Sequence, residues 1–177
     1  MTTFSHVGGG IAVAAAVQHF VFNQEITPST LLVGALLGLL PDLDAIFALV
    51  LGKWSPGAEM LSHHRYITHT PLFYLFLSAV FWIVLDWTWA ILFLMVAWTH
   101  LLMDSWSTDD GIMWLWPVNT KQYSIFQMDS HAGGLFGLQF YTRYLRTPRL
   151  IFPEIIIVAS GVYTILRFVI LRYFSAR

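Results

Sequence analysis

The chain lacks cysteine altogether and carries little charge. With no Cys among its 177 residues, it can form no disulfide, no thiolate zinc site and no cysteine nucleophile. Charged residues make up 11% of the chain, whereas about a quarter is usual for a soluble domain. The net charge of -1 leaves no basic face to displace phosphate counterions, so nucleic acid is excluded as a partner. Any bound metal must therefore be held by nitrogen and oxygen ligands.

Hydrophobic sequence dominates what is present. Hydrophobic residues make up 57% of the chain, including 8 Trp and 14 Phe, and this is the composition of a membrane protein. A bilayer core about 30 Å thick needs roughly 20 apolar residues per helix. Five segments approach this length: residues 7–22, 29–51, 71–85, 87–103 and 151–173. We therefore expect residues 1–177 to form a single integral membrane domain, an all-α bundle of about five transmembrane helices.

The stretch 104–148, between the fourth and fifth predicted helices, contains no clear span. Its early part is aromatic and broken by Pro117, and its later part is rich in glycine, which predicts a segment at the membrane interface. With five spans, the loops at 52–69 and 104–149 share one side with the N-terminus. That side carries most of the Lys and Arg residues. The positive-inside rule places it in the cytoplasm.

Acids and histidines interrupt these apolar segments. A single Asp at the centre of a membrane helix costs roughly 2.5–3.5 kcal/mol. His100 and Asp104 are one helical turn apart and share a face, either as two metal ligands or as an ordinary hydrogen-bonded pair. Asp42 and Asp44 follow Pro41, and both can reach one site if the proline breaks the helix. Otherwise one binds metal and the other orients a ligand or a water molecule, unless both lie in water at a helix end.

A third cluster contains His64, Arg65 and His69. The two histidines do not share a helix face cleanly, so a loop or a helix start must aim them together. Arg65 would repel a stored cation but would bind an anionic phosphate in a bidentate way; the alternative is a guanidinium facing lipid headgroups. His6 becomes a candidate through the topology, which brings every candidate to one membrane face. We expect a centre with one or two divalent ions, Zn²⁺ or Mn²⁺, among seven residues: His6, Asp42, Asp44, His64, His69, His100 and Asp104.

These motifs resemble the predicted metal-dependent hydrolases of the bacterial inner membrane of the YdjM type. The likeness lies in an early His, a Leu-Pro-Asp-x-Asp stretch, a His-Arg-x-x-Thr-His motif and a His-x-x-x-Asp motif, and it covers residues 1 to about 120. The order of ligands is also distantly similar to zinc-dependent bacterial phospholipase C. By that likeness the metal ligands are His6, Asp42, His69, His100 and Asp104. The later His-x-x-x-Glu ligands of that enzyme have no counterpart in this chain, which argues for one or two ions instead of three.

The residues and the resemblance together predict a hydrolase embedded in the bacterial inner (plasma) membrane, with its site near the cytoplasmic face. Metal-activated water attacks the substrate, Asp42 or Asp44 takes a proton or holds a second ion, and Arg65 neutralises a phosphoryl oxygen. A phosphoester of a membrane lipid or lipid-linked molecule suits this location, and carboxylic esters and amides stay open. The alternatives are a divalent metal transporter and a noncatalytic membrane protein whose metal staples helices together.

Overall fold

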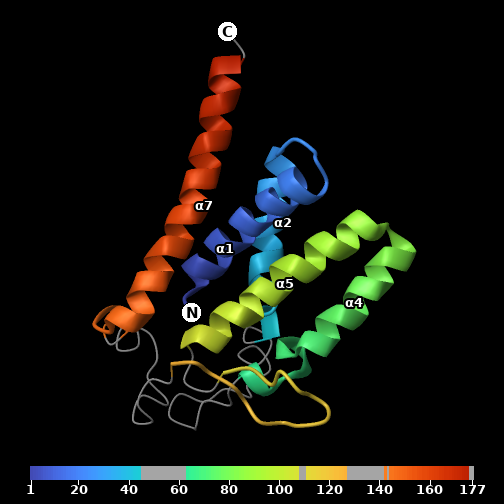
Figure 1. Ribbon diagram of the computed structural model, residues 1–177, viewed down its shortest axis with the longest axis vertical. Coiled ribbons are helices and arrows are strands. Elements are labelled where there is room, and N and C mark those ends of the chain that lie inside the picture. Colours follow the sequence, from blue (N-terminus) through green and yellow to red (C-terminus); the bar gives the residue numbers. More distant parts are fainter. Residues whose placement is uncertain (45–62, 108–110, 127–141, 143, 176–177) are drawn as a thin grey trace.

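The computed structural model describes residues 1–44, 63–107, 111–126, 142 and 144–175, and these residues are mainly helical. Helix α1 (Thr3–Ala16) continues into the π-helical turn η1 (Val17–Val21) and is followed by α2 (Pro28–Leu39). Two 3-10 turns, η2 (His63–Arg65) and η3 (Ile67–His69), precede α4 (Pro71–Val84), α5 (Trp87–Ser107) and α7 (Pro148–Ser175) (Figure 1). The predicted all-α fold is confirmed. Within the described ranges, β-structure is limited to an isolated bridge between Ile112 and Tyr123.

Three helical stretches are long and apolar enough to cross a membrane: Thr3–Val21, Trp87–Trp106 and Pro148–Phe174. Helices α2 and α4 are apolar but shorter. Helix α2 ends at Leu39, just before Pro41, because proline disrupts the helical turn that precedes it. The predicted helix over 29–51 is therefore broken at this point, and its part from residue 45 onward lies outside the described residues.

The start of the first helix corrects one prediction. We expected His6 to precede the first span, but α1 begins at Thr3 and contains His6. The physical reason is Thr2, which adopts an extended conformation at the N-cap position. Its carbonyl accepts hydrogen bonds from the backbone N–H groups of Ser5, at 3.1 Å, and His6, at 3.3 Å. His6 is thus held by helical geometry.

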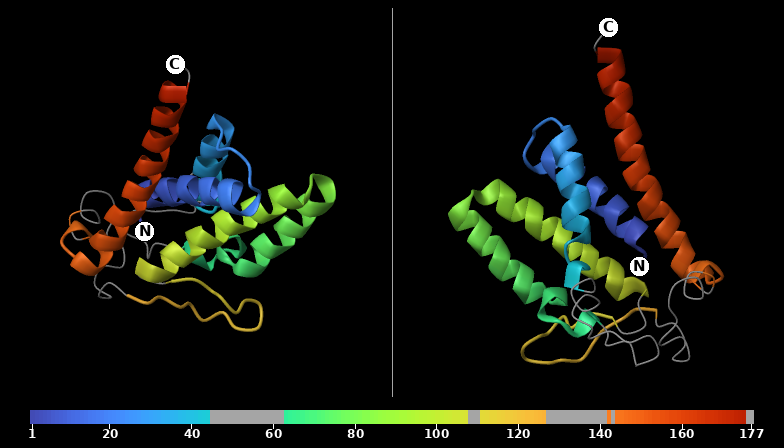
Figure 2. Two further views of the ribbon diagram at one scale, coloured as in Figure 1. Left: turned by 45° about the horizontal axis from the view of Figure 1, so that its top comes forward. Right: turned by 180° about the vertical axis from the view of Figure 1, so that it is seen from behind.

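Helix α1 packs against α2, α5 and α7 and occupies the middle of the bundle (Figures 1 and 2). Glycines bring its backbone into contact with two of these neighbours. A Cβ atom on Gly10 would lie 2.2 Å from the carbonyl oxygen of Gly34 on α2, and one on Gly161 of α7 would lie 2.5 Å from the Cα atom of Gly8. Small residues allow this close approach between membrane helices.

Helices α4 and α5 form an antiparallel hairpin with a very short turn at Asp86. The Asp86 carboxylate accepts hydrogen bonds from the backbone N–H groups of Thr88, at 2.7 Å, and Trp89, at 3.1 Å, and also from the Thr88 hydroxyl. It therefore caps the start of α5. The hydroxyl and the two N–H groups hold the pKa of Asp86 below its ordinary value, because they stabilise the ionised carboxylate.

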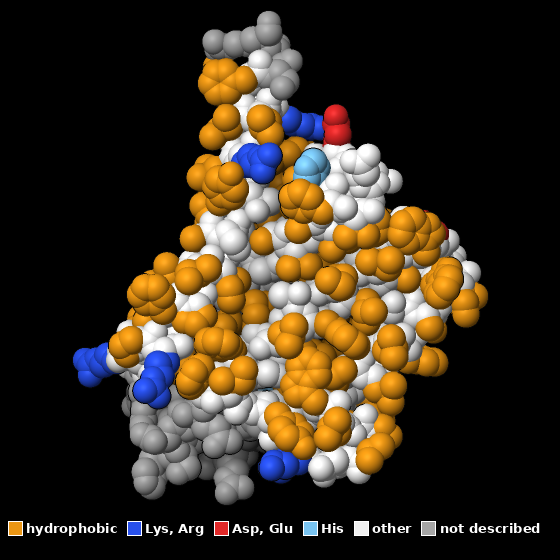
Figure 3. All heavy atoms as spheres, viewed as in Figure 1, with side chains coloured by type: hydrophobic (Ala, Val, Ile, Leu, Met, Phe, Trp, Pro, Cys, Tyr) orange, Lys and Arg blue, Asp and Glu red, His pale blue; other side chains and the backbone are white. Residues whose placement is uncertain are grey.

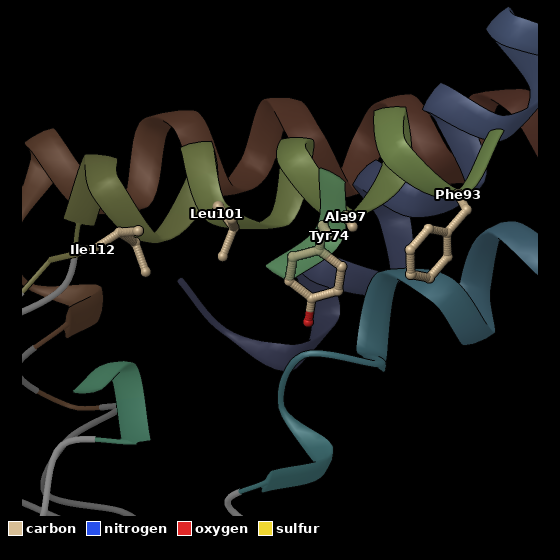
Figure 4. Packing of buried hydrophobic residues seen from close by; sticks show 5 residues of the cluster. All are labelled: Tyr74, Phe93, Ala97, Leu101 and Ile112. Atoms are coloured by element: carbon tan, nitrogen blue, oxygen red, sulfur yellow. The ribbon is translucent and has the colours of Figure 1, made fainter. Parts of the chain in front are cut away.

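One core cluster fills the space between α4 and α5 near the end where the candidate ligands gather. It contains Tyr74, Phe93, Ala97, Leu101 and Ile112, each of them almost completely buried. Figure 4 shows Phe93, Ala97 and Leu101 along one side of α5, with Tyr74 projecting from α4 toward the same layer. This packing fixes the face of α5 that carries His100 and Asp104.

The outer surface is hydrophobic over much of the molecule (Figure 3). Large apolar side chains are exposed along α4 and α7, among them Phe76, Trp82, Phe152 and Ile156. Continuous apolar surface of this kind needs a nonaqueous surrounding. On α7, Arg149 and Arg167 are separated by about 27 Å along a helix axis, which matches the hydrocarbon thickness of a bilayer.

Within the predicted interfacial segment, residues 111–126 are not helical, whereas residues 104–107 belong to α5 and residues 142, 144 and 145 are helical. The stretch 111–126 docks on the end of α5, where the Ile125 backbone N–H donates to the Ser105 carbonyl at 2.7 Å and the Trp114 indole donates to the Ser105 hydroxyl at 2.6 Å. Val118 is 94% exposed in this loop. The glycine-rich part, 127–141, lies outside the described residues.

Candidate metal centre

Separate parts of the chain bring the candidate ligands to one end of the bundle. The ligand atoms form two groups, and within each group they all lie within 4.8 Å of one another. The first group is His6 from α1, Asp42 from the turn after α2, and His100 and Asp104 from α5; the second is His64 and His69 from the 3-10 turns, again with Asp104. Asp104 therefore belongs to both groups, and the predicted convergence of these residues is observed.

The two oxygens of Asp104 face different partners. Its side chain is 2% exposed, and Oδ1 lies 2.8 Å from the α-amino group of Met1 and 3.1 Å from Nε2 of His6. Oδ2 lies 3.0 Å from Nε2 of His100 and 3.6 Å from Nε2 of His64. Oδ2 therefore faces one histidine from each ligand group, whereas Oδ1 faces only His6 and the α-amino group.

The orientation of His100 is set by backbone. Its Nδ1 lies 2.7 Å from the Gly38 carbonyl oxygen, and since a carbonyl only accepts, Nδ1 carries the proton. Nε2 then faces Asp42 Oδ1 at 3.5 Å and Asp104 Oδ2 at 3.0 Å, yet it makes no hydrogen bond within the described part of the chain. A nitrogen lone pair aimed at two carboxylates calls for a cation between them, either a second ring proton or a metal ion.

His69 repeats this arrangement with a different support. Its Nδ1 lies 2.9 Å from Asp44 Oδ2, and Nε2 lies 3.8 Å from Asp42 Oδ1. The Thr68 hydroxyl donates to the same oxygen of Asp44. Burial lowers the pKa of His69, but the contacts with Asp42 and Asp44 outweigh it and raise that pKa above its ordinary value. Of the two acids after Pro41, Asp42 belongs to the first ligand group, whereas Asp44 orients His69.

The break after α2 makes this division of roles possible. The backbone N–H of Asp42 donates to the Leu39 carbonyl at 3.1 Å, in a turn instead of a continued α-helix. Two acids separated by one residue then approach the same cluster, which a regular helix would prevent.

The rings of His6 and His100 stack with centroids 3.8 Å apart and planes at 21°. Two protonated imidazoles at this distance would repel each other. Nδ1 of His6 also has no hydrogen-bond partner among the described residues. Neutral rings that share a metal ion satisfy both observations, so the donor set fits a divalent ion with nitrogen and oxygen ligands.

Arg65 stands apart from this buried cluster. Its side chain is exposed, and its Nε donates to the Gln122 side chain at 3.1 Å. Gln122 in turn donates to the Gly111 carbonyl at 3.2 Å. The structure thus places Arg65 beside the centre, next to buried His64, and not among the ligands.

The sequence was also compared with known proteins. The sequence model described as YdjM inner membrane protein matches residues 1–174. The chain belongs to the YdjM inner membrane protein family. No curated protein and no solved structure gave a match. The YdjM match confirms the resemblance and extends it past residue 120 to nearly the whole chain, and it agrees with the apolar helices in making this a membrane protein. The likeness to phospholipase C is not shown and stays a prediction.

Several contacts of the candidate site residues were not predicted from the sequence. The Gly38 carbonyl, the Met1 amino group and Gln122 each contact a predicted site residue. Of these, Gly38 left a signal, because Gly34 and Gly38 have the small-x-x-x-small spacing of helix contacts. A Cβ atom on Gly38 would lie 2.3 Å from the His6 carbonyl oxygen.

Proposed function

We propose that this protein is a metal-dependent hydrolase of the inner membrane that cleaves a phosphoester in a lipid or lipid-linked substrate. The observation that carries the proposal is the lone pair on Nε2 of His100, which the Gly38 carbonyl directs at two carboxylates. A second imidazole, His69, approaches one of these carboxylates in the same way. Such convergence supports a bound cation.

Two ions suit the two ligand groups. His6, Asp42, His100 and Asp104 would hold one, while His64, His69 and Asp104 would hold the other. Nitrogen and oxygen ligands without thiolate suit Zn²⁺ or Mn²⁺. When bound, divalent ions lower the pKa of water toward neutrality and offset charge on a phosphoryl oxygen.

The chain's own residues would share the remaining work. Asp42 has the most exposed side chain of the ligand groups, at 27%, so it can reach incoming water and take its proton. The water oxygen would bond to phosphorus as the bond from phosphorus to the lipid alcohol breaks, and Asp42 would return the proton that it took from water to the leaving alcohol. Arg65, exposed beside His64, would bind the phosphoryl oxygens through its guanidinium. Asp44 would keep His69 oriented.

The surface near the centre suits an amphiphilic substrate. Leu43 and Ile67, which adjoin Asp42 and Thr68 in the chain, are 40% and 47% exposed and would meet the apolar part of a lipid. Four exposed basic residues also lie in the segments near this end of the bundle: Arg65, Lys121, Arg146 and Arg149. By the positive-inside rule this supports a multi-pass topology with the centre near the cytoplasmic face.

A metal transporter is the competing function. It would need a polar route from the ligands to the opposite end of the bundle. The interior between α1 and α5 is instead packed with Ala14, Val17, Leu92 and Val96, all of them buried. This packing supports an enzyme over a transporter.

The test is hydrolysis by purified protein in lipid nanodiscs. Metal-loaded wild type is expected to release alcohol or phosphate from a panel of phospholipids and polyprenyl phosphoesters, and to lose this activity on chelation. His100→Ala should abolish turnover, while His19→Ala, which changes an exposed histidine outside both ligand groups, should keep it. Absence of turnover on every lipid phosphoester, or an active His100→Ala variant, would refute the proposal. Metal uptake into proteoliposomes would favour transport.

A further inference from the structure

One buried acid is not used by the metal centre. Glu154 is 6% exposed and lies on α7, in a stretch that is long and apolar enough to cross a membrane. An acid inside a membrane segment has a high free-energy cost, so it usually has a specific partner or function. Glu154 belongs to neither ligand group found among the described residues. Its role must follow from the groups that it contacts.

Three donors surround the Glu154 carboxylate. Oε2 accepts hydrogen bonds from the Thr2 backbone N–H at 3.3 Å and from the Tyr144 hydroxyl at 2.8 Å, and Oε1 accepts one from the Thr2 hydroxyl. Thr2 is the N-cap residue of α1, and the first turn of α1 contains no acid. Helix starts leave backbone N–H groups without helical partners and favour a negative charge nearby. Glu154 supplies both needs from a different helix.

The contact with Thr2 leads directly to His6. The Thr2 carbonyl accepts from the His6 N–H at 3.3 Å and from the Ser5 hydroxyl at 2.8 Å. This first turn places Nε2 of His6 3.1 Å from Oδ1 of Asp104. A shift of Thr2 would therefore move the imidazole relative to the carboxylate that both ligand groups share.

The two helices have no slack beside this contact. A Cβ atom on Gly8 of α1 would lie 3.1 Å from the Ile157 carbonyl oxygen of α7, and Ile157 follows Glu154 by less than one helical turn. The two backbones are in close contact there. Thr2 and Glu154 join the same two helices less than one turn away along α7, so a shift of α1 along α7 would break the hydrogen bonds between Thr2 and Glu154. Glu154 sits at the end of the helix pair nearest the centre, where it can fix the register.

We propose that Glu154 is a positioning residue. By accepting hydrogen bonds from Thr2, it fixes the position of α1 along α7 and so places His6 in the metal centre. Helix α7 then shapes the centre although it contributes no residue to either ligand group. This inference deepens the proposed function and rests on it for the metal-binding measurements, whereas a measurement on metal-free protein tests it independently.

Glu154→Gln is the primary variant, because it keeps the shape of the side chain, removes its charge and turns one acceptor into a donor. The full chain in nanodiscs is titrated with Zn²⁺ against a chelator of known affinity. We expect the affinity for Zn²⁺ to fall by about tenfold or more, as for the loss of a contact that supports a ligand. Tyr144→Phe should also lower the affinity for Zn²⁺, but by a smaller factor. Ser160→Ala, whose hydroxyl donates only to Ile157 within α7, should bind as wild type.

A double-mutant cycle separates positioning from general loosening of the bundle. If Glu154 acts through His6, then His6→Ala and His6→Ala/Glu154→Gln have equal Zn²⁺ affinities. A further tenfold loss in the double variant would overturn the inference. Wild-type affinity in both Glu154→Gln and Tyr144→Phe would overturn it as well.

The metal-free readout uses ¹⁵N-labelled histidine. Glu154→Gln should shift the imidazole signals of His6, while those of His19, at the other end of α1 in the turn η1, stay in place. Unchanged His6 signals would refute the positioning role whatever the metal does. A wild type that binds no Zn²⁺ would refute the proposed metal centre, and the His6 signals would still decide the role of Glu154.

Discussion

Asp104→Asn alters the one carboxylate that the two ligand groups share. The variant keeps the side-chain volume and one oxygen, but it loses the negative charge and turns an amide nitrogen toward imidazole nitrogens. In the protein, Oδ2 lies 3.0 Å from Nε2 of His100 and 3.6 Å from Nε2 of His64. We expect wild type to bind two divalent ions per chain and the variant to lose at least one.

The size of the effect follows from the ligands that remain. Without Asp104, the second group keeps only His64 and His69, while the first keeps His6, Asp42 and His100. Protein sites for Zn²⁺ normally have three or four protein ligands, so the second group should empty. The first should weaken by about 100-fold or more, because Asp104 is a direct ligand in the proposed centre and the loss of a contact that only supports a ligand already costs about 10- to 100-fold. Metal-free stability should fall by about 3–5 kcal/mol, since a buried charge cluster loses its acid.

The assay is metal content after dialysis at a series of buffered Zn²⁺ concentrations, with mass-spectrometric counting of ions per chain. Asp86→Asn is the matched control, because it makes the same chemical change at an exposed acid between α4 and α5. Mn²⁺-loaded wild type should also give the exchange-coupled spectrum of two ions that share a carboxylate. Two ions bound with wild-type affinity by Asp104→Asn, or saturation of wild type at one ion, would refute the shared-carboxylate arrangement.

Three further predictions concern positions around the centre. Gly38→Ala would place a Cβ atom 2.3 Å from the His6 carbonyl oxygen. The backbone at residue 38 must then move by about 1 Å, which lengthens the contact between its carbonyl and His100. A chelator titration should therefore show a 10- to 100-fold lower affinity for Zn²⁺. Asp86→Asn should melt at a lower temperature than wild type at pH 7. Because the folded pKa of Asp86 is depressed, its stabilisation is complete above the unfolded value and disappears as pH falls below about 4, so the two melting curves should converge there. Chelation of wild type should lower its melting temperature, since ions at 100 times their Kd contribute about 2.7 kcal/mol, and added Zn²⁺ should restore it.

The helices and the convergence of the ligands could be predicted from the sequence because the signal for each is strong. Apolar segments of membrane length predict helices. Acids and histidines inside them have a high free-energy cost of insertion, which predicts that they interact with one another or with a shared ligand. His100 and Asp104 needed only helical spacing. Pro41 left open in the sequence whether the helix breaks, and the structure shows that α2 ends before it, so that Asp42 and Asp44 approach one cluster.

The supporting contacts could not be predicted in this way. The Gly38 carbonyl is a backbone acceptor, and every residue has one, so nothing in the sequence marks it as the partner of His100. Glu154 lies within the apolar segment predicted as the fifth helix, but nothing in the sequence points to Thr2 as its partner. Its contact with Thr2 joins residues 152 positions apart, and only the packing of α1 on α7 brings them together.

Because Asp104 is common to both ligand groups and follows all their other members in the chain, neither group is complete until the end of α5 has been synthesised. A nascent chain that stalls before the end of α5 presents histidines to the cell's metal pool but has no shared acid to retain an ion. If the centre binds metal as proposed, an ion would be held by the complete groups only after the hairpin of α4 and α5 has formed.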